Sequence, residues 1–355
     1  MNQPRILVSY FFGPRTIPLG EACARGFEAN GCTVYRFNSQ VSHPLDHFGL
    51  KWLAKLARGL HLSDDYLVNG HPWSNLRYRE RCMEKAIANF RPDVLFIIRG
   101  NSFRGPFLKR VKKQFGIARV VGWWVKDPRP DDPQLLADSK LYDDYFCIHR
   151  HGYKEVDGIG YLPALGLEQR PAMPVGNMVP PPRSRGIVLV GGWSKRREAF
   201  VRPLLDLPLT IVGPGWKKRG RLEPAYWSKI LTSQLWGSEV EDFYRSGKIV
   251  LNITSWDPAV LTGLNLRICD VPALGAFLLT DAAAEIAEFV EPGREVATYT
   301  TPEDLREKAL YYLANDTERE AVALAGLRRA ATDIETYAQK MARLLISIGL
   351  AGVAE

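Results

Sequence analysis

No apolar run in this sequence is long enough to cross a bilayer, which takes about 18–20 consecutive apolar residues. The N-terminus also lacks a basic segment followed by an apolar one, so residues 1–15 are interpreted as a first β-strand and not as a signal peptide. The five cysteines are scattered and form no CxxC pair, which argues against a disulfide framework and is typical of a reducing compartment. These absences predict a cytoplasmic protein.

Long blocks of Lys and Arg are absent too, although the net charge is +8. A basic balance attracts polyanions, whether nucleic acid, anionic lipid headgroups or nucleotide phosphates. Because there is no basic tail, nucleic acid is not an expected partner, while peripheral contact with the inner face of an anionic membrane is compatible with the charge. A nucleic-acid-binding protein stays open as an alternative suggested by charge alone, and its affinity for any polyanion would fall steeply with salt.

What the sequence does contain is an alternation of strand and helix patterns that occurs twice. A chain of 355 residues predicts about two domains. Its apolar runs are separated by helical patterns, which is typical of parallel sheets covered on both faces. We therefore expect an α/β protein of two Rossmann-like domains, with ligands beyond the carboxyl ends of the strands. The predicted parts are domains over 1–170 and 187–332, a Pro-rich linker over 171–186, and a C-terminal helix within 333–355.

The first candidate site is the segment VLVGGWSKRRE, in which a predicted strand ends at Val190. Glycines let the backbone approach a phosphate, and a helix N-terminus beside basic side chains attracts anions. The alternative is a tight strand-to-helix turn beside a solvated basic helix face. The predicted phosphate contacts are Gly191, Gly192, Trp193, Arg196 and Arg197.

The second candidate is VGPGW, where Gly213 and Gly215 suit a sharp exit from a strand. An ordinary loop with a charged, solvated tail explains this segment equally well.

The third candidate is NITSWDPAVLTGLNLRICD, in which Thr262–Gly263 is expected to open a helix that carries Asn265, Arg267 and Asp270. The N-terminus of that helix would hold a diphosphate, and a carboxylate about two turns further on would bind ribose hydroxyls. The alternative is a surface ion pair between Arg267 and Asp270, because residues three apart share a helix face.

The fourth candidate is Asp127 in GWWVKDP, just after a strand predicted to end at Val125. A carboxylate at that edge could act as a general base toward an acceptor hydroxyl. An Asp-Pro turn followed by helix capping is the favoured alternative.

Two weaker patterns point to ordinary structure. Cys147, His149 and His151 alternate, but a partly buried strand end explains them better than a metal site. The aromatic and basic stretch from Trp73 to Arg81 could stack on bases, but an amphipathic helix or an acceptor-side surface is the preferred interpretation.

The segments LNLRICDVPALGAFLLTD and EFVEPGREVATYTTPEDLREKALYYLANDTER resemble the CgeB-type spore-maturation glycosyltransferase-like family. GWWVKDP and GIGYLPALG resemble two further elements of the same family. The resemblance covers roughly the last two-thirds of the chain; it is specific between Asn265 and Leu313 and weak before Pro92.

This resemblance implies a GT-B fold, in which two Rossmann-like domains face each other across a cleft and the final helix crosses back to the first domain. The N-terminal domain would bind the acceptor and the C-terminal domain a nucleoside diphosphate sugar. Related retaining enzymes carry two donor-site glutamates eight positions apart, where this chain has Thr262 and Asp270. Lys126 and Asp127 stand where the family has two aspartates.

We therefore predict a metal-independent glycosyltransferase, without a cofactor, that moves a sugar from a nucleoside diphosphate sugar to a hydroxyl of a glycan, lipid or protein. Arg267 would neutralise the departing diphosphate, and Asp270 would hold the ribose. Asp127 would be the general base that acts on the acceptor hydroxyl. The remaining predicted donor contacts are the four phosphate-binding residues Thr262, Gly263, Leu264 and Asn265. Gly237 and Val240 are predicted to lie near the base of the nucleotide. The alternatives are a sugar-nucleotide epimerase on the same fold and a non-catalytic surface-layer or spore-assembly protein that retains it.

Overall fold

The computed structural model describes residues 3–99, 102–125, 133–149, 158–173, 182–218, 224–259 and 262–350. The chain divides into two compact units. Unit 1 comprises Met1–Leu162 and Tyr337–Glu355, and unit 2 comprises Pro163–Thr336. Among the described residues, no helix has both the length and the apolar composition that crossing a membrane requires.

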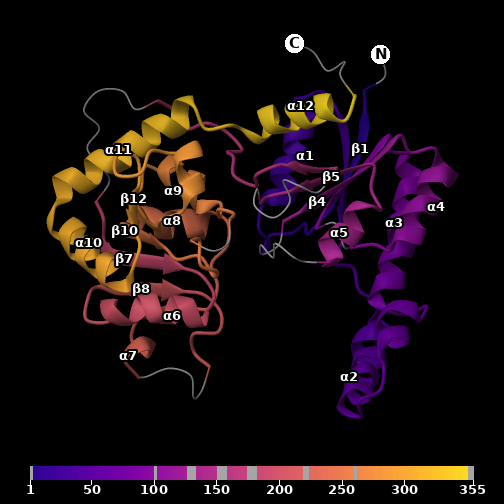
Figure 1. Ribbon diagram of the computed structural model, residues 1–355, viewed down its shortest axis with the longest axis horizontal. Coiled ribbons are helices and arrows are strands. Elements are labelled where there is room, and N and C mark those ends of the chain that lie inside the picture. Colours follow the sequence, from indigo (N-terminus) through magenta and orange to yellow (C-terminus); the bar gives the residue numbers. More distant parts are fainter. Residues whose placement is uncertain are drawn as a thin grey trace. The chain divides into compact units, whose positions relative to one another are not determined.

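Unit 1 is built on a parallel sheet of six strands in the order β2-β1-β3-β4-β5-β6. Every residue of β3 is buried, as expected for a parallel strand covered on both faces. The strands are β1 (Arg5–Tyr10), β2 (Thr33–Asn38), β3 (Val94–Ile98), β4 (Arg119–Trp124), β5 (Asp144–Cys147) and β6 (Ile159–Tyr161). The helices around this sheet are α1 (Leu19–Ala29), α3 (Asn75–Phe90), α4 (Gly105–Phe115), α5 (Pro133–Ser139) and α12 (Tyr337–Ser347), as Figure 1 shows.

The C-terminal helix α12 belongs to unit 1, where it packs against α1. The Asn30 side chain at the end of α1 donates a hydrogen bond to the carbonyl of Ala338 over 2.7 Å. A methyl group added at Gly26 would lie 2.6 Å from the carbonyl oxygen of Tyr337, so the two helices approach each other at a glycine. The predicted return of the last helix to the first half of the chain is therefore present.

A helical arm lies between β2 and α3 in the sequence. It consists of α2 (Lys51–Gly59), flanked by the short π-helical turns η1 (Asp46–Leu50) and η2 (Tyr66–Gly70). Figure 1 shows α2 projecting away from the sheet of unit 1.

Unit 2 repeats the plan with a second parallel sheet, in the order β12-β11-β10-β7-β8-β9. Its strands are β7 (Arg185–Val190), β8 (Leu209–Val212), β9 (Ile230–Thr232), β10 (Gly247–Asn252), β11 (Leu278–Asp281) and β12 (Ala297–Tyr299). Its helices are α6 (Lys195–Val201), η3 (Arg202–Leu204), α7 (Pro224–Trp227), α8 (Ser238–Ser246), α9 (Arg267–Ala273), η4 (Ala284–Glu288), α10 (Pro302–Ala314) and α11 (Asp316–Thr332).

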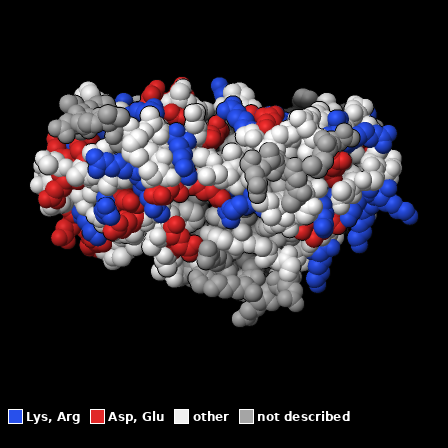
Figure 2. All heavy atoms as spheres, turned by 90° about the horizontal axis from the view of Figure 1, so that it is seen from above, with Lys and Arg blue, Asp and Glu red and all other residues white. Residues whose placement is uncertain are grey.

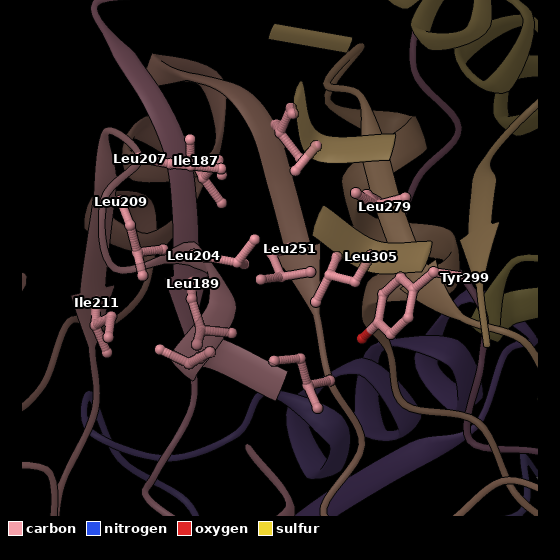
Figure 3. Packing of buried hydrophobic residues seen from close by; sticks show 14 of the residues in the cluster. Ile187, Leu189, Leu204, Leu207, Leu209, Ile211, Leu251, Leu279, Tyr299 and Leu305 are labelled. Carbon is pink, nitrogen blue, oxygen red and sulfur yellow. The ribbon is translucent and has the colours of Figure 1, made fainter. Parts of the chain in front are cut away.

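The core of unit 2 forms where strand side chains meet the helices. Figure 3 shows Leu189 and Leu251, from the adjacent strands β7 and β10, packed toward Leu305 of α10. Helix α10 begins as its sequence predicts, since Thr301 caps it by accepting a hydrogen bond from the amide of Asp304 over 3.1 Å.

The division between the units lies away from the Pro-rich stretch. Unit 2 already begins at Pro163, because Leu165 and Leu167 are buried in its core. The amide of Leu167 also donates to the carbonyl of Glu335 over 3.0 Å, which places the first and last residues of unit 2 side by side. Strand β7 begins at Arg185, inside the range expected for the linker.

Candidate functional site

The candidate site lies at the carboxyl ends of β7 and β10. β7 is the first strand of its sheet in sequence and has β10 on one side and β8 on the other, so the strand order reverses there. In open parallel sheets, ligands bind outside the carboxyl ends of the strands at such a reversal.

Arg267, the first residue of α9, connects these strand ends. Its Nη2 donates to the carbonyl of Val190 over 2.5 Å, and its Nη1 donates to the side-chain oxygen of Asn252 over 3.2 Å. Its Nε donates to the hydroxyl of Tyr244 on α8 over 2.8 Å. A guanidinium group has five N–H bonds, so these contacts orient the group without using all of its donors.

Arg197 on α6 reaches the same edge. Its Nε donates to the carbonyl of Ile253 and its Nη1 to the carbonyl of Gly192, both over 2.8 Å. Burial lowers the pKa of Arg197 to about 10, and the positive charge of Arg267 acts in the same direction, although Asp281 opposes it. Among the described residues, neither Arg197 nor Arg267 forms an ion pair. Two guanidinium groups without a carboxylate partner therefore converge at the edge, an arrangement that suits an anion.

Arg196 differs from its neighbour because its charge is already matched. Its Nη1 donates to the carboxylate of Asp281 over 2.8 Å, and this carboxylate also accepts from the amide of Thr254 over 2.9 Å. Asp281 is 3% exposed, so Arg196 and Asp281 form a largely buried pair that fixes the loop after β10.

The two glycine turns lie side by side. The amide of Gly191 donates to the carbonyl of Val212, and the amide of Trp193 donates to that of Pro214, each over 2.8 Å. A methyl group at Gly213 would lie 2.0 Å from the carbonyl oxygen of Gly191, so only glycine fits there. The amides of Gly191 and Trp193 are engaged in this pairing. Within the described residues, the amide of Gly192 is therefore the only one of this turn that is available to a phosphate.

The prediction that Thr262–Gly263 opens a helix is wrong. Helix α9 begins at Arg267, and residues 262–265 form an extended loop that precedes it. Gly263 adopts a left-handed backbone with φ of 104°, and its amide donates to the carboxylate of Glu285 over 2.6 Å. The side chain of Asn265 then accepts a hydrogen bond from the amide of Arg267 over 3.1 Å, which forms an Asx turn just before α9.

The surface ion pair between Arg267 and Asp270 is not formed among the described residues, because the Arg267 guanidinium is directed to Tyr244, Asn252 and Val190. Asp270 is partly buried on α9. Burial raises its pKa to about 7; Arg267 opposes this shift, and the carboxylates of Glu241 and Glu168 add to it.

Gly237 and Val240, which are predicted to lie near the base of the nucleotide, are at the start of α8. Gly237 precedes this helix with φ of 56°, and Val240 lies in its first turn, partly buried against the core of unit 2. Helix α8 also supplies Tyr244, so the segment that follows QLW is connected to Arg267. Thr262 and Leu264 lie in the loop before α9, where Thr262 is partly buried and Leu264 is buried.

Asp127 and His151 lie outside the described residues. Cys147 is buried, which raises the pKa of its thiol to about 12, and its sulfur accepts a hydrogen bond from the amide of His149. In the part of the chain that the structure describes, no three His, Cys, Asp or Glu residues are grouped as metal ligands.

Two site residues were missed by the sequence reasoning. Asn252 is 1% exposed and accepts hydrogen bonds from both Asn265 and Arg267, over 2.8 Å and 3.2 Å. Asp281 is the carboxylate that holds Arg196. Each is a polar residue at the carboxyl end of a largely buried strand, a signal that the sequence carries.

Comparisons with known proteins agree with this geometry. Residues 196–346, which include Arg196, Arg197, Arg267 and Asp270, match the sequence model of a family described as glycosyl transferase-like. No curated protein matches the chain.

Solved structures similar to this chain cover both units. Sucrose-phosphate synthase from Thermosynechococcus elongatus aligns with a TM-score of 0.67 at 13% identity, over 99% of this chain and 100% of that one. HepE from Anabaena, solved in complex with UDP-glucose, aligns with a TM-score of 0.59 at 12% identity, over 97% and 99%. A putative UDP-N-acetylglucosamine 2-epimerase from Listeria monocytogenes aligns with a TM-score of 0.52 at 13% identity, over 100% and 99%. Together with the two six-stranded parallel sheets, these likenesses show the GT-B fold.

Proposed function

We propose that this protein is a glycosyltransferase that moves a sugar from a nucleoside diphosphate sugar to an acceptor hydroxyl. The observation that carries the proposal is the convergence of Arg197 and Arg267, neither paired with a carboxylate, at the strand reversal of unit 2. Both arginines lie within residues 196–346, the segment that matches the glycosyl transferase-like family model.

The chemistry of sugar transfer needs positive charge at the leaving group. Negative charge builds up on the diphosphate as its bond to the sugar breaks, and fixed guanidinium groups stabilise that charge without reorganising. Arg267 is the proposed catalytic residue, and Arg197 with the amide of Gly192 supplies further diphosphate contacts. Arg196 and Asp281 hold the loop around them.

The remaining roles are proposed from position. Asp270, in α9, holds the ribose hydroxyls, and Gly237 and Val240 at the start of α8 contact the base. Asp127 is the proposed base for the acceptor. No metal ion is required in this scheme, because the arginines neutralise the diphosphate.

A nucleotide screen by thermal shift tests the proposal. Because HepE was solved with UDP-glucose, UDP is the first probe, with ADP and GDP beside it. A nucleotide at 100 times its Kd should stabilise the folded protein by about 2.7 kcal/mol. If none of the three shifts the unfolding transition, the donor site proposed here does not exist.

A sugar-nucleotide epimerase is the second candidate, favoured by the alignment with the Listeria protein. An epimerase would convert the donor alone into an isomer, whereas a glycosyltransferase needs an acceptor. Incubating the donor without an acceptor and analysing the nucleotide sugars by chromatography separates the two.

The proposed role of Asp270 predicts that the KM for the donor depends on pH. Ribose hydroxyls donate to an ionised carboxylate, so the KM for the donor should fall as the pH rises through about 7, the pKa to which burial raises this group. In Asp270→Asn, which cannot ionise, this dependence should disappear. The measurement is the donor KM between pH 5.5 and 8.5.

The same group should lower the stability of the natural protein as the pH rises, although donor binding improves. A carboxyl group whose pKa is raised on folding holds its proton more tightly in the folded state, so it destabilises the fold as the pH rises from about 4 toward about 7. The free energy of unfolding of Asp270→Asn, minus that of the natural protein, should therefore be larger at pH 8 than at pH 5. A donor KM with the same pH profile in both proteins would contradict the role of Asp270.

Two finer assignments complete the proposal. Membership of the CgeB-type family rests on the motifs between Asn265 and Leu313. A cytoplasmic location is supported by cysteines that are all free thiols, four of them buried.

A further inference from the structure

The strand reversal of unit 1 carries a second group of arginines. β1 is the first strand of that sheet and lies between β2 and β3, so the reversal falls between the carboxyl ends of β1 and β3. Phe11 follows β1 and Arg99 follows β3. The topology thus places both residues where an open parallel sheet binds its ligand.

Arg99 is held in an unusual backbone conformation. Its φ is 66°, a left-handed value that costs energy for a residue with a side chain. Its amide donates to the carbonyl of Trp123 over 2.8 Å, and its carbonyl accepts from the hydroxyl of Ser102 over 2.9 Å. Its guanidinium carbon lies 4.8 Å from the centre of the Phe11 ring. The backbone contacts hold Arg99 against this strain, as at many ligand sites.

Arg79 of α3 reaches the same loop. Its Nη1 donates to the carbonyl of Ser102 over 3.1 Å, while its Nε is buried and has no hydrogen-bond partner among the described residues. Burial lowers the pKa of Arg79, and the charge of Arg99 adds to this effect. A buried N–H without an acceptor costs about 1–3 kcal/mol, so the position favours binding of an anion.

The nearby carboxylate is already engaged elsewhere. Glu80 accepts two hydrogen bonds from Arg104, over 2.8 Å and 2.6 Å, and pairs with Arg77 as well. Among the described residues, neither Arg79 nor Arg99 has an ion-pair partner. Within the described part of the chain, Glu80 therefore acts on Arg79 at a distance and forms its direct ion pairs with other arginines.

We propose that Arg79 and Arg99 bind an anionic group, a phosphate or a carboxylate, on the acceptor substrate. This inference rests on the proposed function, in which unit 1 receives the acceptor, and it restricts the acceptor to a negatively charged molecule. The ring of Phe11, beside Arg99, offers an apolar surface next to the charge.

Three probes with the same sugar ring separate the possible charges. Glucose 6-phosphate, glucuronate and glucose carry a phosphate, a carboxylate and no charge. Their binding to the full-length protein is measured by calorimetry at low salt in the presence of UDP. We expect one or both charged probes to bind at least tenfold more tightly than glucose, and the stronger of them names the anionic group.

The variants test the two arginines separately. Arg99→Asn removes the charge with a residue that tolerates left-handed backbone, and Arg79→Gln is compatible with helix α3. Each should weaken binding of the charged probe at least tenfold and leave the UDP affinity unchanged. Arg81→Gln, on the same helix but directed to the carbonyl of Pro72, should bind the probe like the natural protein.

Three results would overturn this inference: no binding of either charged probe, equal binding of glucose, or unchanged binding in both variants. An intact UDP interaction would then leave the proposed function standing. Loss of UDP binding in the natural protein would instead count against the proposed function itself.

A different observation concerns the helical arm. Seven of its apolar side chains are exposed: Trp52 (65%), Leu53 (45%), Leu56 (47%), Leu60 (61%), Leu62 (62%), Tyr66 (64%) and Val68 (44%). Trp52, Leu56 and Leu60 recur at intervals of four, so they share one side of the helix. Contiguous apolar exposure of this kind marks an interaction surface.

The net charge of unit 1, which carries the arm, favours an anionic partner. Lys51, Lys55 and Arg58 lie on the same helix and are all exposed. Lys51 pairs with Asp46 over 3.5 Å and Arg58 with Asp64 over 3.2 Å, so the excess of positive charge comes from the rest of unit 1. Unit 1 holds 26 Lys and Arg against 17 Asp and Glu, whereas unit 2 holds 21 against 22. Within unit 1, Figure 2 shows blue spheres on the side where Figure 1 places α3 and α4. The whole positive excess of the protein thus belongs to the unit that carries the arm.

We infer that the arm binds the surface of an anionic lipid bilayer, with Trp52, Leu56 and Leu60 entering the interface. An amphipathic helix with aromatic and aliphatic residues on one side and basic residues beside them binds such surfaces by burying apolar area and by attraction to charged headgroups.

Vesicle sedimentation tests this surface. The natural protein should sediment with vesicles of phosphatidylcholine and phosphatidylglycerol at low salt, and much less with phosphatidylcholine alone. The double variant Trp52→Ser, Leu56→Ser should lower the partition coefficient at least tenfold. Trp227→Ser removes a tryptophan that is 53% exposed in unit 2 and should change nothing. Equal sedimentation of the two tryptophan variants would overturn the inference, and so would a natural dimer that the double variant dissociates.

Discussion

Replacing Arg267 with alanine should lower the kcat of sugar transfer by about 10²–10³-fold, the usual loss when one preorganised donor to a developing negative charge is removed. The guanidinium is fixed by three hydrogen bonds, to Val190, Asn252 and Tyr244, so it contributes a charge that needs no reorganisation during the reaction. The measurement is the steady-state rate with saturating donor and acceptor, alongside the UDP affinity of the variant.

Loss of structure has to be separated from loss of catalysis, because Arg267 also holds the strand ends together. Tyr244→Phe removes one hydrogen bond of Arg267 and leaves the charge of Arg267 in place, so this variant should retain most of the kcat. Arg294→Ala removes an arginine whose side chain is 72% exposed in unit 2 and should leave both kcat and stability unchanged. A kcat near the natural value in Arg267→Ala, with the protein folded, would remove Arg267 from the catalytic machinery.

The sequence was sufficient to predict the two sheets because their strands are buried on both faces. β3 is a continuous apolar run and β10 contains the apolar run Ile249–Leu251, a pattern typical of parallel sheets covered by helices. Glycine turns and basic residues at the ends of such runs then pointed to Gly191, Arg197, Gly213 and Arg267. All four lie at one edge of unit 2.

What the sequence could not supply were the contacts between distant segments. Helix α9 begins later than predicted because Glu285, 22 residues further on, holds the amide of Gly263 in an extended loop. Asp281 lies 85 residues from Arg196, and nothing local indicates that the two form a buried pair. The boundary between the units followed the burial of Leu165 and Leu167 and not the prolines. Local patterns thus identified positions at strand ends, while tertiary contacts decided which donors remain available to a ligand.

Gly213→Ala should destabilise unit 2 by more than about 3 kcal/mol, a loss that single substitutions reach only through severe clashes of this kind. The added methyl carbon would lie 2.0 Å from the carbonyl oxygen of Gly191 and 2.4 Å from its carbonyl carbon. Both contacts are with backbone, so no side chain can rotate away. The turn of Gly191 to Trp193 would have to move, and with it the carbonyl of Gly192 that holds Arg197. UDP affinity should therefore fall together with stability, as measured by chemical denaturation and calorimetry.

Two other glycines at the site provide matched controls for this effect. A methyl group at Gly192 would have no contact closer than 3.4 Å, so Gly192→Ala should keep the stability of the natural protein. Gly237 has open space around it but a φ of +56° and a ψ of −132°, so Gly237→Ala should cost about 1–3 kcal/mol through backbone strain alone. The expected order of destabilisation is thus Gly213, Gly237 and Gly192. If Gly213→Ala were no more destabilising than Gly237→Ala, the close approach of the two turns would be wrong, and the edge that orients Arg197 would need another explanation.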